Sequence, residues 1–71
     1  MSAAGEGGGE GLEALVASLE ATYHAIDREL RSHSEAANRG ERQLAERHRV
    51  EVERLEGVAR GITARLAVAV P

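Results

Sequence analysis

Apolar residues return at every third or fourth position along most of the chain, between Leu12 and Ala69. In the first part of this stretch the steps alternate between four and three residues, which is the heptad spacing that keeps one helix face turned toward a partner helix. The residues of this first seam are Leu12, Val16, Leu19, Tyr23, Ile26, Leu30, His33 and Ala37. The pattern predicts an amphipathic helix over residues 12–37, with Leu15 widening its apolar face.

A second apolar stripe follows in the C-terminal part of the chain. Its residues are Leu44, His48, Val52, Leu55, Ala59, Ile62, Leu66 and Ala69. The steps from Leu44 to Leu55 are four, four and three residues, which breaks the heptad phase before regular steps resume. We therefore expect a second helix over residues 41–69 and a seam that is weakest near the middle of the chain.

The residues between the two stripes, 38–40, predict a turn. Gly40 suits the left-handed conformation that ends many helices. Alternatively, Asn38 with Glu41 three residues later could cap the start of the second helix. We therefore predict an all-α fold, namely a two-helix antiparallel hairpin or coiled coil. One long continuous helix is the alternative, because the first seam continues in phase through Gly40 to Leu44.

Charge agrees with the antiparallel arrangement. Residues 1–27 carry acidic side chains and no Arg, whereas residues 57–71 carry Arg60 and Arg65 and no acid. A hairpin or an antiparallel dimer lays the acidic end beside the basic end. Exposed ion pairs contribute only about 0.2–1 kcal/mol each, so charge biases the orientation more than it stabilises the fold.

The first eleven residues differ in composition from the rest of the chain. Met1–Gly11 contains five glycines, is acidic and has no large apolar residue after Met1. Such a segment cannot bury a core, and we predict a flexible tail. It lacks the Lys-Ser/Thr pair of a phosphate-binding loop and the pattern of a signal or transit peptide. With no apolar run of membrane-spanning length, we expect a cytoplasmic or nuclear protein.

Composition limits what the chain can do alone. It has 71 residues, no Phe, no Trp and a single Tyr, so its core is small. A domain of this size buries little apolar surface, and we expect it to need a partner for stability. The net charge of −3 argues against a nucleic-acid binder, although the basic segment Arg39–Arg49 could form a small patch for an acidic partner.

No pattern in the sequence indicates catalysis, a cofactor or a metal site. The chain has neither Cys nor Lys, and no His/Asp constellation accompanies its serines. His24 shares a helix face with Glu20 and Asp27, but three groups on one solvated face are a weak indication of a metal site. His33 and His48 fall on the predicted seams, where they could make an interface pH-sensitive. Partly exposed histidines in a loosely packed region are the simpler interpretation.

Small residues form a further line on the second predicted helix. Gly57 and Gly61 are spaced four apart, roughly opposite the seam of Leu55 and Ile62. Small residues allow the backbones of two helices to approach closely, so this helix could contact neighbours on two sides. A tolerant, frayed C-terminal helix is the other interpretation. Under the first, replacing Gly57 and Gly61 by Leu abolishes assembly.

These observations favour a non-enzymatic structural subunit that co-assembles with other helical chains. We expect hetero-oligomeric coiled-coil partners, while a self-sufficient homo-oligomeric bundle is an alternative and a regulatory or nucleic-acid-binding module a weaker one. The residues expected to form the interface are Leu12, Leu15, Val16, Leu19, Tyr23, Ile26, Leu30, Leu44, Val52, Leu55, Gly57, Gly61, Ile62 and Leu66.

Overall fold

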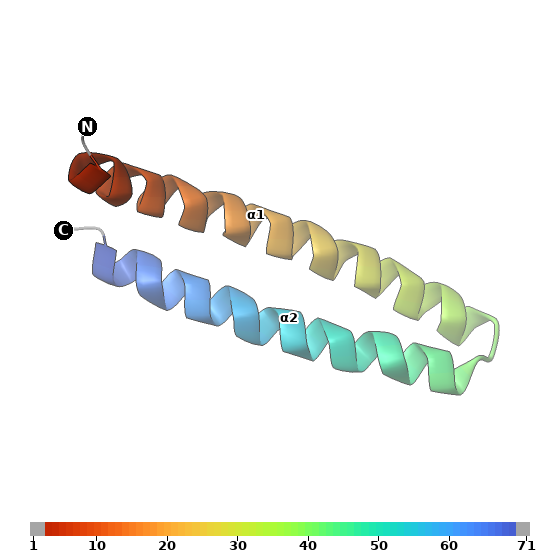
Figure 1. Ribbon diagram of the computed structural model, residues 1–71. Helices are drawn as coiled ribbons and strands as arrows, with labels where there is room; N and C mark the ends of the chain where they lie inside the picture. Colours follow the sequence, from red (N-terminus) through yellow and green to blue (C-terminus); the bar gives the residue numbers. More distant parts are fainter. Residues whose placement is uncertain (1–2, 70–71) are drawn as a thin grey trace.

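The chain forms a two-helix antiparallel hairpin, shown by a computed structural model that describes residues 3–69, with side chains described from residue 11 onward (Figure 1). Helix α1 runs Ala3–Asn38 and helix α2 runs Arg42–Ala69. They lie side by side along a rod of 55 × 19 × 14 Å, with the first turns of α1 and the last turns of α2 at the same end. The predicted hairpin is confirmed, and the alternative of one continuous helix is wrong.

The start of α1 differs from the predicted helix start at Leu12, because the helix begins at Ala3. Residues 3–11 were expected to lie outside the helix as a tail, and this boundary is corrected. Once a helix has formed, each further residue adds one hydrogen bond, so the helix nucleated beyond Leu12 can extend into the glycines. Each glycine still weakens a helix by about 0.5–1 kcal/mol relative to Ala. Flexibility of this segment stays a prediction, and residues 1–2 lie outside the described part.

The turn between the helices is closed by backbone hydrogen bonds around Gly40, whose φ is 78°. The Gly40 N–H donates to the Ala37 carbonyl at 3.0 Å, and the Glu41 N–H donates to the Ala36 carbonyl at 2.9 Å. This pair of bonds is the Schellman motif, in which a residue in the left-handed region satisfies the last carbonyls of a helix. Gly40 therefore ends α1, as one of the two sequence interpretations predicted.

The seam of α2 keeps regular heptad spacing along its whole length, so the predicted break is wrong. Its buried or half-buried members are Ala45, His48, Val52, Leu55, Ala59, Ile62 and Leu66. The seam begins at Ala45 instead of Leu44, which changes the first step from four residues to three. Leu44 is half-buried at the edge of this seam. The sequence argument chose Leu44 because it is the larger apolar residue, whereas the hairpin places the small alanine between the helices.

The seam of α1 also differs in part from the predicted one. The line of Leu19, Ile26 and His33 faces α2 as expected, and all three are half-buried. The second line, however, lies one residue earlier than predicted. Its members are Leu15, Thr22, Glu29 and Ala36 instead of Val16, Tyr23, Leu30 and Ala37. The apolar face of α1 is wider than α2 can cover, and α2 packs over the edge that carries the smaller and more polar residues.

The core between the helices is thin. Its buried apolar residues are Ala36, Ala45, Val52, Ala59 and Ile62, so three of the five are alanines. Thr22 is buried as well, and its hydroxyl donates to the Ser18 carbonyl at 2.7 Å, which satisfies it within its own helix. Small residues let the helices lie close together but bury little apolar surface each. The hairpin therefore has limited stability of its own.

Candidate helix-docking groove

Three of the exposed large apolar residues of α1 lie in one line outside the core. Val16, Tyr23 and Leu30 are 43%, 55% and 49% exposed. They are spaced seven residues apart, so they form one line along the helix, directly beside the half-buried line of Leu19, Ile26 and His33. This line, which we call the free stripe, was predicted to face a partner helix. In the hairpin α2 does not cover it.

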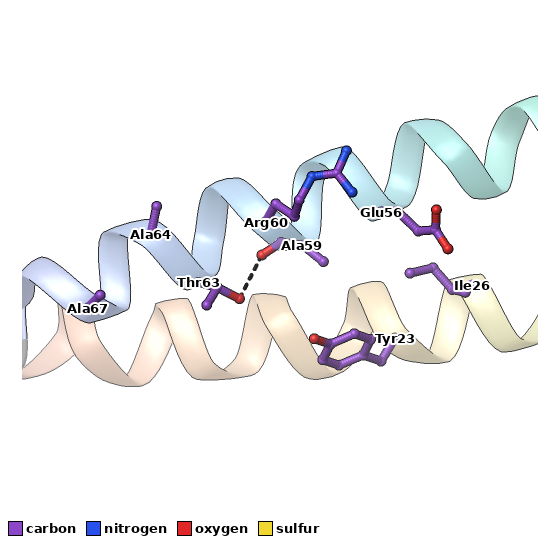
Figure 2. Close-up of a pocket in the computed structure, with 8 residues that line it drawn as sticks. All are labelled: Tyr23, Ile26, Glu56, Ala59, Arg60, Thr63, Ala64 and Ala67. Atoms are coloured by element: carbon purple, nitrogen blue, oxygen red, sulfur yellow. Dashed lines mark hydrogen bonds between the residues drawn. The ribbon is translucent and has the colours of Figure 1, made fainter.

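A groove of about 750 Å³ lies between the two helices, beside Tyr23 of the free stripe (Figure 2). Tyr23 and Ile26 line it from α1. The α2 side is built from small residues with two charged ones among them. These are Glu56, Ala59, Arg60, Thr63, Ala64 and Ala67. The groove thus has one bulky, apolar wall and one wall that leaves room for an incoming side chain.

The small wall presents few unsatisfied polar groups to a ligand. The Thr63 hydroxyl donates to the Ala59 carbonyl of its own helix at 2.9 Å, drawn as a dashed line in Figure 2. A hydroxyl satisfied in this way is less costly to cover with apolar surface. Ala64 and Ala67 offer only methyl groups. The wall can therefore accept an apolar side chain, while Glu56 and Arg60 supply charge at its surface.

Charged side chains divide the surface of α2 into two halves. Toward the turn, Arg49 pairs with both Glu46 and Glu53, and the Arg54 Nε donates to Glu51 Oε1 at 3.0 Å. Hydrogen bonds from these arginines lower the pKa of Glu46 and Glu51 below the usual value for glutamate. Within the described chain, no ion pair involves a residue from 55 to 69. The groove lies in this second half.

A polar contact crosses the seam nearer the turn. His48 Nδ1 lies 2.6 Å from Glu29 Oε1, and the two side chains are 24% and 29% exposed. Because a carboxylate only accepts hydrogen bonds, the imidazole N–H is the donor. Sequence reasoning placed His48 on the seam but did not identify Glu29. Glu29 lies one helical turn from both Ile26 and His33, and this spacing was the signal in the sequence that placed it on the seam side.

The basic segment Arg39–Arg49 is partly neutralised. Arg39 pairs with Glu41 at 2.8 Å, and Arg49 pairs with two glutamates as described above. Arg42 and Arg47 line a hollow of about 510 Å³ at the turn, together with Gly40, Glu41, Gln43 and Leu44. The basic groups are thus spread among acids instead of forming one continuous surface.

The predicted interface residues fall into three groups. Val52 and Ile62 are buried between the helices, and Leu15, Leu19, Ile26, Leu44, Leu55 and Leu66 are half-buried. Leu12, Val16, Tyr23, Leu30, Gly57 and Gly61 are exposed. A Cβ at Gly61 would meet nothing within 4 Å, and one at Gly57 would touch only the Arg60 guanidinium at 3.8 Å. The two glycines therefore lie on open surface, outside the hairpin's own packing.

Sequence reasoning missed the small wall of the groove. Ala59 was assigned to the seam, but Thr63 and Ala67 were not chosen as contacts. Their spacing relative to Glu56 and Arg60, with steps of four, three and four from residue 56 to 67, repeats the heptad pattern along the edge of the seam. Small size hides such residues from an argument that counts only large apolar side chains.

Among the described residues, no group of three or more His, Cys, Asp or Glu side chains could hold a metal ion. Within that same part of the chain, neither helix has the length and apolar character needed to cross a membrane. Comparison with models of protein families, with curated proteins and with solved structures finds no match to this chain. The groove and the free stripe are the features of the hairpin that indicate a function.

Proposed function

We propose that the chain is a non-enzymatic helical assembly module, a structural subunit that co-assembles with other helices through the free stripe and the groove. The observation that carries this proposal is the exposure of Val16, Tyr23 and Leu30 in one line beside an apolar groove. Exposed apolar residues that gather in a row, in contrast to scattered ones, are typical of binding surfaces. A helix laid in the groove would cover Tyr23, and one that also follows the free stripe would cover Val16 and Leu30.

The thin core supports the same proposal. With alanine at three of five buried apolar positions, the hairpin gains little from its own packing. A further helix on the free stripe would bury large side chains that α2 leaves in water, at roughly 25 cal/mol per Å² of apolar surface. Binding to the folded state then raises the stability of the hairpin itself. Folding and assembly are thus coupled in this proposal.

The test compares three substitutions that separate folding from assembly. Leu55→Asp and Leu19→Asp place a charge between α1 and α2, where both leucines are half-buried. We expect these variants to lose helical circular dichroism and assembly together. Tyr23→Asp changes an exposed residue. We expect it to keep the helical signal and to lose assembly.

Assembly is measured as the particle size of the tagged chain in extracts of cells that express it, by native gel filtration. We expect the wild-type chain in a particle well above its own mass of 7.5 kDa, and the Tyr23→Asp variant near that mass. Val58→Asp, an exposed position that does not line the groove, is the matched control. A wild-type chain at monomer size, or a Tyr23→Asp variant that assembles normally, would refute the proposal.

A further inference from the structure

From the groove we infer that its occupant is a second copy of this chain, packed so that the turns of both hairpins lie at the same end of a four-helix bundle. This inference rests on the proposed function and names the partner. In such a dimer the two-fold axis runs along the hairpin, and α1 of each copy lies beside α2 of the other. Neighbouring helices are then antiparallel throughout, as in most short four-helix bundles.

The groove carries both halves of a self-complementary contact. A two-fold axis brings the same patch of each copy together, so a patch that pairs with itself must hold a protruding part and a receiving part. Tyr23 is the protruding part, with its ring exposed on α1. The receiving part is the small wall of Thr63, Ala64 and Ala67 on α2. Both line the same groove, as Figure 2 shows.

The level of these residues along the rod fits the same-end arrangement. Because Tyr23 and Arg60 line the same stretch of the groove, they lie at similar heights in the hairpin. A two-fold axis along the rod preserves that height. The second copy's Tyr23 therefore enters the groove of the first copy beside Arg60, at the end of the small wall that lies nearer the turn. One contact of this kind forms on each side of the axis.

Charge favours the same orientation. Glu13, Glu20 and Asp27 are spaced seven residues apart and form an acidic line next to the free stripe on α1. In the same-end dimer this line runs along the second copy's α2, where Arg60 is exposed beside Glu56 and is in no ion pair of the described chain. With the turns at opposite ends, α1 would lie against α1, and the acidic lines of the two copies would repel each other.

The first experiment is sedimentation equilibrium of the purified full chain over a wide range of concentration. We expect the mass to rise from 7.5 kDa toward twice that value and to stop there. Tyr23→Asp should weaken the dimer at least 10-fold, while Val58→Asp leaves its dissociation constant within 2-fold of the wild type. Circular dichroism of each variant confirms that the hairpin is folded. A monomer at all concentrations, an assembly larger than a dimer, or a dimer indifferent to Tyr23→Asp would overturn the inference.

A charge exchange tests the orientation. Glu20→Arg and Arg60→Glu should each weaken the dimer several-fold, and the chain with both changes should recover at least half of that loss in affinity. Absence of recovery would overturn the same-end packing.

The results also separate this inference from the proposed function. A purified chain that is monomeric, combined with a large particle in cell extract that Tyr23→Asp disrupts, would mean that a different helical chain occupies the groove. The second copy is then refuted and the proposed function stands. Monomer size both in extract and after purification would refute both.

Discussion

Glu29 and His48 meet across the two helices, with Nδ1 of the imidazole 2.6 Å from Oε1 of the carboxylate. They occupy seam positions that apolar residues fill elsewhere in the hairpin. A half-buried polar pair is weakly stabilising at best, because each group loses water contacts when it enters the seam. Its effect is on register, since a slide of one helix along the other separates the two side chains.

Replacing one member of this pair should cost stability. Glu29→Ala leaves the imidazole without its acceptor, and we expect a loss of about 1 kcal/mol in the free energy of unfolding. Replacing both members by Leu should instead raise the stability, because it adds apolar packing and removes both polar groups. Urea unfolding followed by circular dichroism measures both effects. A double variant less stable than the wild type would show that the pair itself stabilises the hairpin.

Gly40 should not tolerate a side chain. Its φ of 78° lies in the left-handed region, and we expect Gly40→Ala to lower the free energy of unfolding by about 1–2 kcal/mol. Gly61→Ala is the matched control, because a Cβ there meets nothing within 4 Å and φ is not positive. That change should stabilise α2 by about 0.5–1 kcal/mol. Thermal unfolding of both variants gives the comparison, and equal effects would contradict the turn geometry.

Ala36 should not accept a larger residue. It is 0% exposed, at the point where α1 approaches the turn. We expect Ala36→Leu to destabilise the hairpin by about 1–3 kcal/mol, because the added methylene and methyl groups must push the helices apart. Ala37→Leu, on the neighbouring exposed position, is the control and should be nearly neutral. Chemical denaturation measures both, and a neutral Ala36→Leu would show that the helices are less closely packed than described.

Acid should weaken the turn half of α2. Arginines lower the pKa of Glu46 and Glu51 in the folded chain, so these carboxylates bind protons more weakly when folded than when unfolded. Their contribution is present above the ordinary glutamate pKa of about 4.3 and is lost as pH falls through the lowered folded value. We expect thermal stability to fall below about pH 4, and Glu46→Gln with Glu51→Gln to flatten that decline. An unchanged pH profile in this double variant would refute the assignment.

More of the fold than of the groove could be predicted from the sequence. Heptad steps, Gly40 and the opposite charges of the two ends were enough for the antiparallel hairpin. The phase of each seam could not be predicted from these signals. Residues 22 and 23, like residues 29 and 30, lie on adjacent lines of the same helix, and the residues of the other helix decide which line is buried. The sequence argument chose the larger residue of each pair. The hairpin buried Thr22 and left Tyr23 exposed.

The groove itself exists only once the two helices are aligned. Tyr23 and Ala67 are far apart in the sequence, and no spacing rule within one helix brings them together. Gly57 and Gly61 were predicted to form a second contact face. They lie on open surface, and the second contact face stays a prediction. Val68, which is 87% exposed, does not line the groove.

The uneven distribution of ion pairs along the rod also bears on the order in which the hairpin forms. The short connection at Gly40, the buried Ala36 and Ala45, and the paired arginines of α2 all lie toward one end. Contacts there join residues close in sequence, so closing them costs little chain entropy and is fast. We therefore expect the hairpin to form from the turn outward. We expect it to open first at the end where the groove lies, which is the end that a docked helix would hold shut.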